Sequence, residues 1–185
     1  MIYFMRHGLD DERFIGGWSD NGLIYNGRKQ VENTVSYLKQ NPIYFDQIYS
    51  SDLVRAKETA EMVQKEFKVP ILLDEKLREQ NKGDFNGIFA LKAKLENPEF
   101  FQNITEDTVY PNGESLRSFW ERIEINLPYF LEQDNTLIVT HRGVINYLYY
   151  QMSNMNIDMN KKQFGVTHAS IHEYNPKTKQ IRKLY

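Results

Sequence analysis

Short runs of apolar residues alternate along the chain with longer segments in which apolar residues recur every three or four positions. A continuous apolar run bounded by charge or glycine predicts a buried strand, whereas the three-to-four spacing predicts a helix with one buried face. The expected strands cover Met1–Met5, Phe45–Tyr49, Ile71–Leu73, Thr136–Thr140, Ser170–Tyr174 and Gln180–Leu184. The expected helices cover Ile24–Leu38, Leu53–Phe67, Ile88–Glu96, Glu114–Leu131 and Val144–Met152.

The helix-ending and helix-capping residues between these elements are consistent with this assignment. Asn41-Pro42 is expected to end the first helix, and Pro128 to kink the fourth or end it early. Ser50-Ser51-Asp52 offers N-cap residues for the second helix, and Gly27 lies on the buried face of the first, where a close backbone approach is possible. Strands that alternate with helices predict an α/β sandwich with a mostly parallel sheet, and we expect one domain over 1–185.

Composition narrows the class of protein. The 185 residues are 41% hydrophobic and 26% charged, as in ordinary globular proteins. The net charge of -2 argues against a nucleic-acid partner. The chain has no cysteine, which removes disulfides, thiolate metal sites and cysteine nucleophiles. No apolar run reaches the roughly 20 residues of a membrane span, so we expect no membrane association and a cytoplasmic protein.

Two histidine-containing tripeptides follow strands. Arg6-His7-Gly8 comes directly after the first strand and His141-Arg142-Gly143 after the fourth. Ligands of open α/β sheets bind beyond the carboxyl ends of the strands, so His7 and His141 are expected to meet there. Arg55, near the start of the second helix, would add a guanidinium where a helix N-terminus favours an anion. Each residue alone has an ordinary structural explanation, but together they indicate phosphoryl transfer to an imidazole nitrogen.

Several short stretches, in a fixed order along the chain, carry a family resemblance. They are Arg6-His7-Gly8, Gly17–Asp20, Gly27–Gln30, Ser50–Ala60, Leu77-Arg78-Glu79, Asn112–Ser115 and Thr140-His141-Arg142-Gly143. The set resembles the histidine phosphatase superfamily, the phosphoglycerate mutase-like proteins. The resemblance is clear to about residue 150 and weaker beyond it. It implies a three-layer α/β/α sandwich with a mostly parallel sheet.

The resemblance also implies residue roles. His7 would be the nucleophile that becomes phosphorylated, and Glu79 the acid for the leaving oxygen and then the base for water. Arg6, Arg55 and His141 would hold the phosphoryl oxygens. A neutral imidazole is a good nucleophile when its other nitrogen is fixed as a donor, and a carboxyl beside a phosphate dianion has a raised pKa. No metal or other cofactor is expected.

The chain departs from the family pattern in the loop after Gly8. A hydroxyl residue and an Asn that help to hold phosphate in relatives are replaced by the segment Leu9–Arg13. We interpret Asp10-Asp11-Glu12 as a solvated loop, and Arg13 as a possible substrate contact. Arg142 stands where relatives often have Gly and would add positive charge to the phosphate site, whereas Asn86 replaces a second acidic residue.

Three functional classes stay open at this point. The favoured class is a metal-independent phosphomonoester hydrolase for a small phosphorylated metabolite. The alternatives are a phosphoglycerate-type mutase and a catalytically weak phosphate-binding or interaction module on the same fold. Retention of both histidines, the arginines and Glu79 favours an enzyme, with Asp84 the next candidate for the acid. His168 and His172 are expected on one face of a terminal strand in structural roles. The oligomeric state is open.

Overall fold

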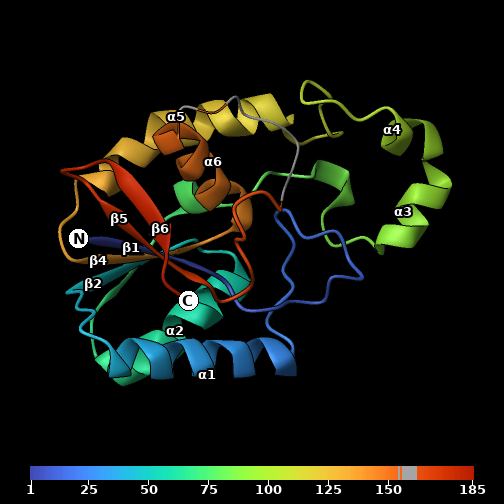
Figure 1. The fold of residues 1–185 in the computed structure, drawn as a ribbon. Coiled ribbons are helices and arrows are strands. Elements are labelled where there is room, and N and C mark those ends of the chain that lie inside the picture. Colours follow the sequence, from blue (N-terminus) through green and yellow to red (C-terminus); the bar gives the residue numbers. More distant parts are fainter. Residues whose placement is uncertain (154, 156–161) are drawn as a thin grey trace.

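Helices and strands alternate through most of the chain, which the computed structural model describes at residues 1–153, 155 and 162–185. The strands are β1 (Ile2–Arg6), β2 (Gln47–Ser50), β3 (Ile71–Leu73), β4 (Thr136–Thr140), β5 (Ile171–Asn175) and β6 (Gln180–Lys183). The helices are α1 (Tyr25–Gln40), α2 (Val54–Phe67), α3 (Ala90–Glu96), α4 (Pro98–Gln102), α5 (Leu116–Leu131) and α6 (Arg142–Ser153), with short 3-10 turns at Glu75–Leu77 and Gly83–Phe85 (Figure 1).

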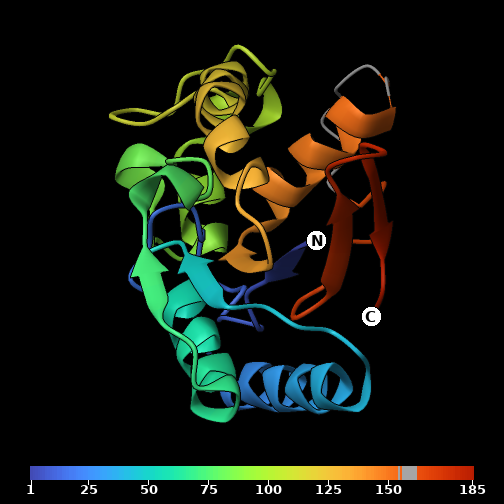
Figure 2. The ribbon, with the colours of Figure 1, turned by 90° about the vertical axis from the view of Figure 1, so that its left-hand side faces the viewer.

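The described strands form one six-stranded sheet in the order β3-β2-β4-β1-β5-β6. The neighbours β3, β2, β4 and β1 are parallel, β5 is antiparallel to β1, and β6 is antiparallel to β5. The terminal hairpin and β3 therefore lie at opposite edges of the sheet (Figure 2). The predicted α/β sandwich with a mostly parallel sheet is confirmed.

Two apolar cores, one on each face of the sheet, hold the three layers together. Alternate residues of β1 divide between them, because successive strand residues point to opposite faces. Ile2 and Phe4 pack with residues of α5 and α6, whereas Tyr3 and Met5 pack with residues of α1 and α2. Figure 1 shows these helix pairs above and below the sheet, with α3 and α4 projecting to one side.

Two sequence-based expectations about helix ends are wrong. Of the two alternatives for Pro128, an early helix end is wrong: Pro128 lies inside α5, which continues to Leu131 because Leu127 and Phe130 on either side of it are buried in the core. The N-cap of α2 is Leu53, without a side-chain bond. None of the helices in the described ranges is both long and apolar enough to cross a membrane.

The close backbone approach expected at Gly27 is present. A Cβ at Gly27 would lie 2.0 Å from the Leu9 carbonyl oxygen, and one at Gly8 would lie 2.7 Å from the Gly27 carbonyl oxygen. The backbone amide of Leu9 also donates to the Gln30 side chain at 3.1 Å. Helix α1 is thus seated directly against the turn that follows β1.

Candidate active site

The two tripeptides meet at the carboxyl edge of the sheet. Strands β1 and β4 are adjacent and parallel, with Arg6 paired to Thr140, so His7 and His141 follow the two strands side by side. Their ring centroids are 5.1 Å apart. The expectation that the two histidines come together is therefore confirmed by the strand register alone.

His7 is buried and held in one orientation. Its Nδ1 donates to the Gly8 carbonyl oxygen at 2.7 Å, and Arg55 Nε lies 3.3 Å from its Nε2. Burial, and next the charge of Arg55, lower the pKa of His7 well below its usual value. The imidazole is therefore neutral, with the Nε2 lone pair directed toward the guanidinium of Arg55.

Two buried guanidinium groups border this nitrogen. Arg55 donates to the carbonyl oxygen of Gly17 at 2.6 Å and lies 3.6 Å from the carboxylate of Asp10. Arg6 donates to the carbonyl oxygen of Val166 at 3.0 Å. Backbone carbonyls accept hydrogen bonds from part of each guanidinium group. The two arginine side chains are therefore held in place, and their positive charges are not fully neutralised.

A cavity of about 560 Å³ opens over these groups and is lined by Arg6, His7, Arg55, Glu79 and Arg142. Arg142, the first residue of α6, brings a further cation, as expected. The lining also includes the aromatic residues Phe14, Phe101, Tyr110, Phe119 and Trp120. The cavity combines a cationic floor for a phosphoryl group with an apolar wall for the organic part of an ester.

His141 is buried beside His7 and is oriented by a serine. Its Nε2 lies 2.9 Å from Ser51 Oγ, and its Nδ1 has no hydrogen-bond partner among the described residues. Burial and the arginines lower its pKa well below the usual value. Ser51 was expected only as a helix N-cap residue, and it instead orients the second imidazole.

Glu79 reaches the cavity with its carboxylate fixed by backbone amides. Gly143 N donates to Oε2 at 3.0 Å, and Gln80 N donates to Oε1 at 3.0 Å. Burial raises the pKa of Glu79, but these amides and the charge of Arg55 outweigh it, so the protein itself lowers the pKa. The raised pKa expected from the sequence therefore depends on an arriving phosphate dianion.

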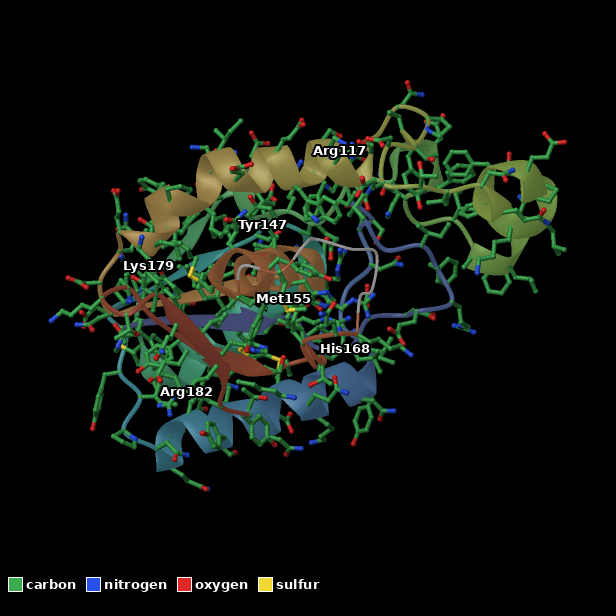
Figure 3. The ribbon with its side chains drawn as sticks, turned by 45° about the horizontal axis from the view of Figure 1, so that its top comes forward. Arg117, Tyr147, Met155, His168, Lys179 and Arg182 are labelled. Atoms are coloured by element: carbon green, nitrogen blue, oxygen red, sulfur yellow. The ribbon has the colours of Figure 1, made fainter. Side chains whose placement is uncertain are left out.

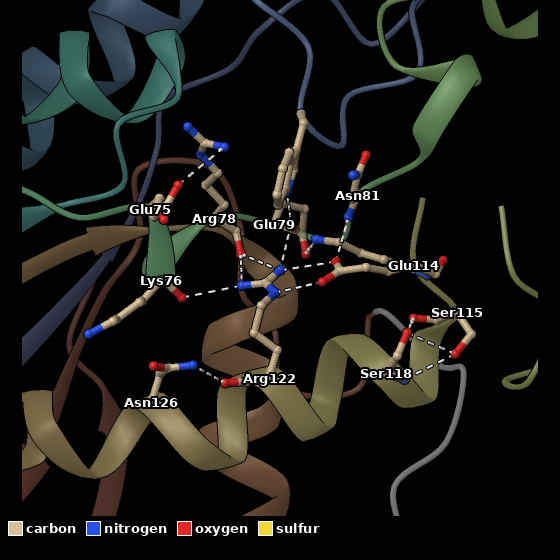
Figure 4. Close-up of polar contacts among 12 residues, drawn as sticks. Glu75, Lys76, Arg78, Glu79, Asn81, Glu114, Ser115, Ser118, Arg122 and Asn126 are labelled. Carbon is tan, nitrogen blue, oxygen red and sulfur yellow. Dashed lines mark hydrogen bonds and ion pairs between the residues drawn. The ribbon is translucent and has the colours of Figure 1, made fainter. Parts of the chain in front are cut away.

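Arg122 of α5 holds the segment that carries Glu79. Its guanidinium donates to the carbonyl oxygens of Arg78, at 3.3 Å, and Glu79, at 3.1 Å, and it pairs with the Glu114 carboxylate at 2.6 Å (Figure 4). Glu114 in turn accepts from the amide of Asn81 at 2.8 Å. Sequence reasoning did not select Arg122, because an arginine on an amphipathic helix ordinarily faces solvent.

Two candidate residues lie outside the cavity. Arg13 is exposed and its guanidinium pairs with Asp11 at 2.6 Å, so the suggested substrate contact would require this side chain to leave Asp11. Asp84, the alternative acid, is exposed and accepts from the Asn112 amide at 3.0 Å. Asn86 also serves a loop rather than the cavity, because its Oδ1 accepts from the amide of Trp18 at 2.9 Å.

The expectation that His168 and His172 share a strand is wrong. His172 lies within β5 and is buried between Tyr149 and Ser170, each 2.8 Å away. His168 precedes the strand and lies beside the loop after β1 (Figure 3). It accepts from Arg6 at 2.5 Å, and its ring centroid is 5.6 Å from that of His7. Burial and Arg6 lower the pKa of His168 to about 3.

Asp10 is the largest departure from the expected site. It was expected in a solvated loop, yet it is only 7% exposed and lines the cavity. Its backbone forms an isolated bridge with Leu23, which turns the loop inward. Nitrogen and oxygen atoms of His7, Asp10 and His168 lie within 4.8 Å of one another.

We assign no metal ligands to that group of three. Arg55 and Arg6 already donate to the ring nitrogens of His7 and His168. A metal cation there would compete for these lone pairs and lie against two permanent positive charges. The surroundings suit an anion.

Comparison with known proteins places this geometry in a family. The sequence model of the histidine phosphatase superfamily (branch 1) matches residues 2–185. The chain is 33% identical over 159 residues to phosphoglycerate mutase-like protein 4 of Arabidopsis thaliana, covering 80% of this chain and 69% of that protein. It is 28% identical over 173 residues to a 2,3-bisphosphoglycerate-dependent phosphoglycerate mutase of Parvibaculum lavamentivorans, covering 84% and 81%. The alpha-ribazole phosphatase structure from Shigella flexneri superposes with a TM-score of 0.81 at 25% identity, covering 99% of this chain and 94% of that one.

Proposed function

The chain belongs to the histidine phosphatase superfamily (branch 1), and we propose that it is a phosphomonoester hydrolase that forms a phosphohistidine on His7. The observation that carries the proposal is the state of His7. Its Nδ1 is committed to the Gly8 carbonyl, and its neutral Nε2 faces the buried guanidinium of Arg55. A phosphoryl group needs this combination, a fixed nucleophile beside fixed positive donors.

The proposed reaction has two steps. Nε2 of His7 attacks phosphorus while the bond from phosphorus to the ester oxygen breaks, and Glu79 gives that oxygen its proton. Water then attacks the phosphohistidine, Glu79 takes the proton of the water, and the P–N bond breaks to release phosphate. Arg6, Arg55 and Arg142 would hold the phosphoryl oxygens from the cavity floor, and the unpartnered Nδ1 of His141 would add a donor.

Glu79 starts the first step only if it is protonated. Its pKa is lowered by the protein alone, and a bound dianion raises the pKa of a neighbouring carboxyl. The ester itself therefore prepares the acid, and departure of the alcohol leaves the carboxylate as a base.

Turnover of p-nitrophenyl phosphate in the presence of a chelator tests the hydrolysis. The wild-type protein should release phosphate, and His7→Asn should abolish release while keeping a wild-type melting temperature. Quenched reactions with labelled substrate should show an acid-labile, base-stable phosphoryl group on the peptide that contains His7. A label on a serine, or turnover by His7→Asn at the wild-type rate, would refute the phosphohistidine mechanism.

A mutase reaction is the second candidate, because some relatives are named as mutases and Lys82 and Lys94 line the outer cavity. Hydrolysis is favoured because residues 80–113 hold only three lysines, at 82, 92 and 94, among several acidic residues. A phosphoglycerate mutase must also bind the carboxylate of its substrate, and additional basic residues would be expected for that purpose. Interconversion of 2- and 3-phosphoglycerate with a bisphosphoglycerate primer, faster than phosphate release, would decide for the mutase.

A further inference from the structure

Asp10 places a carboxyl group where the proposed function needs room for an anion. Its carboxyl oxygen lies within 4.8 Å of ring nitrogens of both His7 and His168, and 3.6 Å from Arg55 Nε. The residue is buried and lines the cavity beside the nucleophile. A phosphoryl group on His7 would therefore lie within reach of this side chain.

An ionised Asp10 would oppose such a group in two ways. It would repel the phosphoryl oxygens, and it would neutralise Arg55, the cation nearest to the His7 nucleophile. A protonated Asp10 reverses both effects, because the carboxylic acid donates a hydrogen bond to a phosphoryl oxygen and leaves Arg55 its full charge. The two protonation states should therefore differ strongly in affinity for a dianion.

The groups around Asp10 favour the protonated state. Burial raises the pKa of Asp10, and Glu12 of the same loop adds to the effect. Arg55 from α2 and Arg6 from β1 act in the opposite direction, but the balance still raises the pKa. His7 and His168, which face it from β1 and from the segment before β5, are neutral because their own pKa values are lowered.

We propose that Asp10 binds the phosphoryl group as a carboxylic acid, so that a site in which Asp10 is ionised takes up one proton from solvent with each tetrahedral dianion. Above the pKa of Asp10 in the free protein, the dianion affinity then falls by about tenfold for each pH unit. This coupling of proton uptake to dianion binding rests on the proposed function only because both use the same anion site. It requires no turnover.

Sulfate is the suitable probe, because it remains a dianion across the range from pH 5 to pH 8. Isothermal titration of the protein with sulfate, in two buffers of different ionisation enthalpy, gives both the affinity and the number of protons taken up. For the wild type at pH 8 we expect Asp10 to take up about one proton, in addition to any uptake by Glu79, whose pKa a bound dianion also raises. We also expect a sulfate affinity at least tenfold weaker at pH 8 than at pH 5.5. For Asp10→Asn, which keeps a neutral donor of the same size, we expect about one proton less uptake, a weaker dependence of affinity on pH, and sulfate binding at least tenfold tighter than wild type at pH 8.

Two control variants identify the protonated group. Asp11→Asn changes the adjacent carboxyl, which is paired with Arg13 outside this cavity, and should behave as the wild type. Glu79→Gln removes a second cavity carboxyl, whose pKa a bound dianion also raises, so the uptake that remains in this variant belongs to Asp10 and should still approach one proton at pH 8. Uptake that is lost in Glu79→Gln and kept in Asp10→Asn would overturn the proposal, as would pH-independent or undetectable sulfate binding by the wild type. Proton-linked sulfate binding in a protein that hydrolyses no phosphomonoester would refute the proposed hydrolysis and leave the role of Asp10 standing.

Discussion

Gly143 has no Cβ, and the space this leaves is occupied by the carboxylate of Glu79. Proton donation by Glu79 should therefore depend on a glycine at position 143. A Cβ built at Gly143 would lie 2.2 Å from Glu79 Oε1 and 2.9 Å from a ring carbon of Phe119. The carboxylate would have to retreat to the 3.0–3.4 Å of a tight real contact, a displacement of about 1 Å, which can cost about 100-fold in rate at a reacting centre. Gly143→Ala should therefore disturb proton transfer without touching His7.

The leaving group distinguishes this effect from general damage. An alkyl phosphate needs a proton on its departing oxygen, whereas p-nitrophenolate leaves without one. We expect kcat/KM of Gly143→Ala to fall about 100-fold on an alkyl phosphate and only a few-fold on p-nitrophenyl phosphate. The Phe119 contact should also destabilise the fold by about 1–3 kcal/mol, measurable by urea unfolding.

Two comparisons make the test decisive. In Gly22→Ala, the new Cβ would meet the Glu58 carboxylate at 2.9 Å, away from the cavity, so activity on both esters should be unchanged. Combined with Glu79→Gln, Gly143→Ala should cause little further loss on the alkyl ester, because both changes act on one carboxyl. Equal losses on the two esters, or full additivity in the double variant, would refute the argument that Gly143 acts through Glu79.

Three further changes have distinct expected results. Arg122→Met removes the guanidinium that holds the Glu79 segment, and should lower kcat on an alkyl phosphate more than on p-nitrophenyl phosphate and reduce stability by about 1–3 kcal/mol in urea unfolding. Ser51→Ala leaves the His141 ring without its partner, and should reduce kcat/KM about tenfold on both esters alike, because it acts on the phosphoryl group. His172 has its pKa lowered to about 3, chiefly by burial, so the unfolded chain takes its proton first and stability is lost as the pH falls below 6.5. His172→Gln should therefore be less stable than wild type at pH 7.5, with the difference narrowing by about 1–2 kcal/mol at pH 5 in urea unfolding; a constant difference would contradict this.

The parts of the fold that the sequence predicts best are those with a strong apolar pattern. Thr136–Thr140 forms a fully buried strand with the expected bounds, because a continuous apolar run has few alternatives to burial in a sheet. Ile71–Leu73 also has the expected bounds, but it is an edge strand on which Leu72 and Leu73 stay exposed. The short helix α4 and the two 3-10 turns were not predicted. They are too short for a periodic pattern, and loop contacts decide their conformation.

The residues of the site divide in the same way. His7 and His141 could be predicted because strand ends fix their positions. Asp10 and His168 could not, since each enters the site through a loop whose path depends on distant contacts. Ser51 directly follows β2 beside β4, so the strand-end rule places it next to His141, although the sequence suggested only an N-cap role for it. For Asp10 the deciding contact is the bridge to Leu23 just before α1, which no local pattern in Leu9–Arg13 reveals.

Asp10 and Glu79, which both line the cavity, show how local donors outweigh burial in setting the pKa of a carboxyl group. Burial alone would raise the pKa of both Asp10 and Glu79. Glu79 accepts two backbone amide hydrogen bonds that stabilise its charge, and its pKa falls; Asp10 is not compensated to that extent, and its pKa rises. Two carboxyl groups whose pKa values are shifted in opposite directions can take different roles. Asp10 therefore takes a proton more readily than Glu79 and holds it beside a bound dianion. Glu79 gains a proton only through the charge of the ester itself, so the acid forms where a leaving oxygen is present to receive its proton.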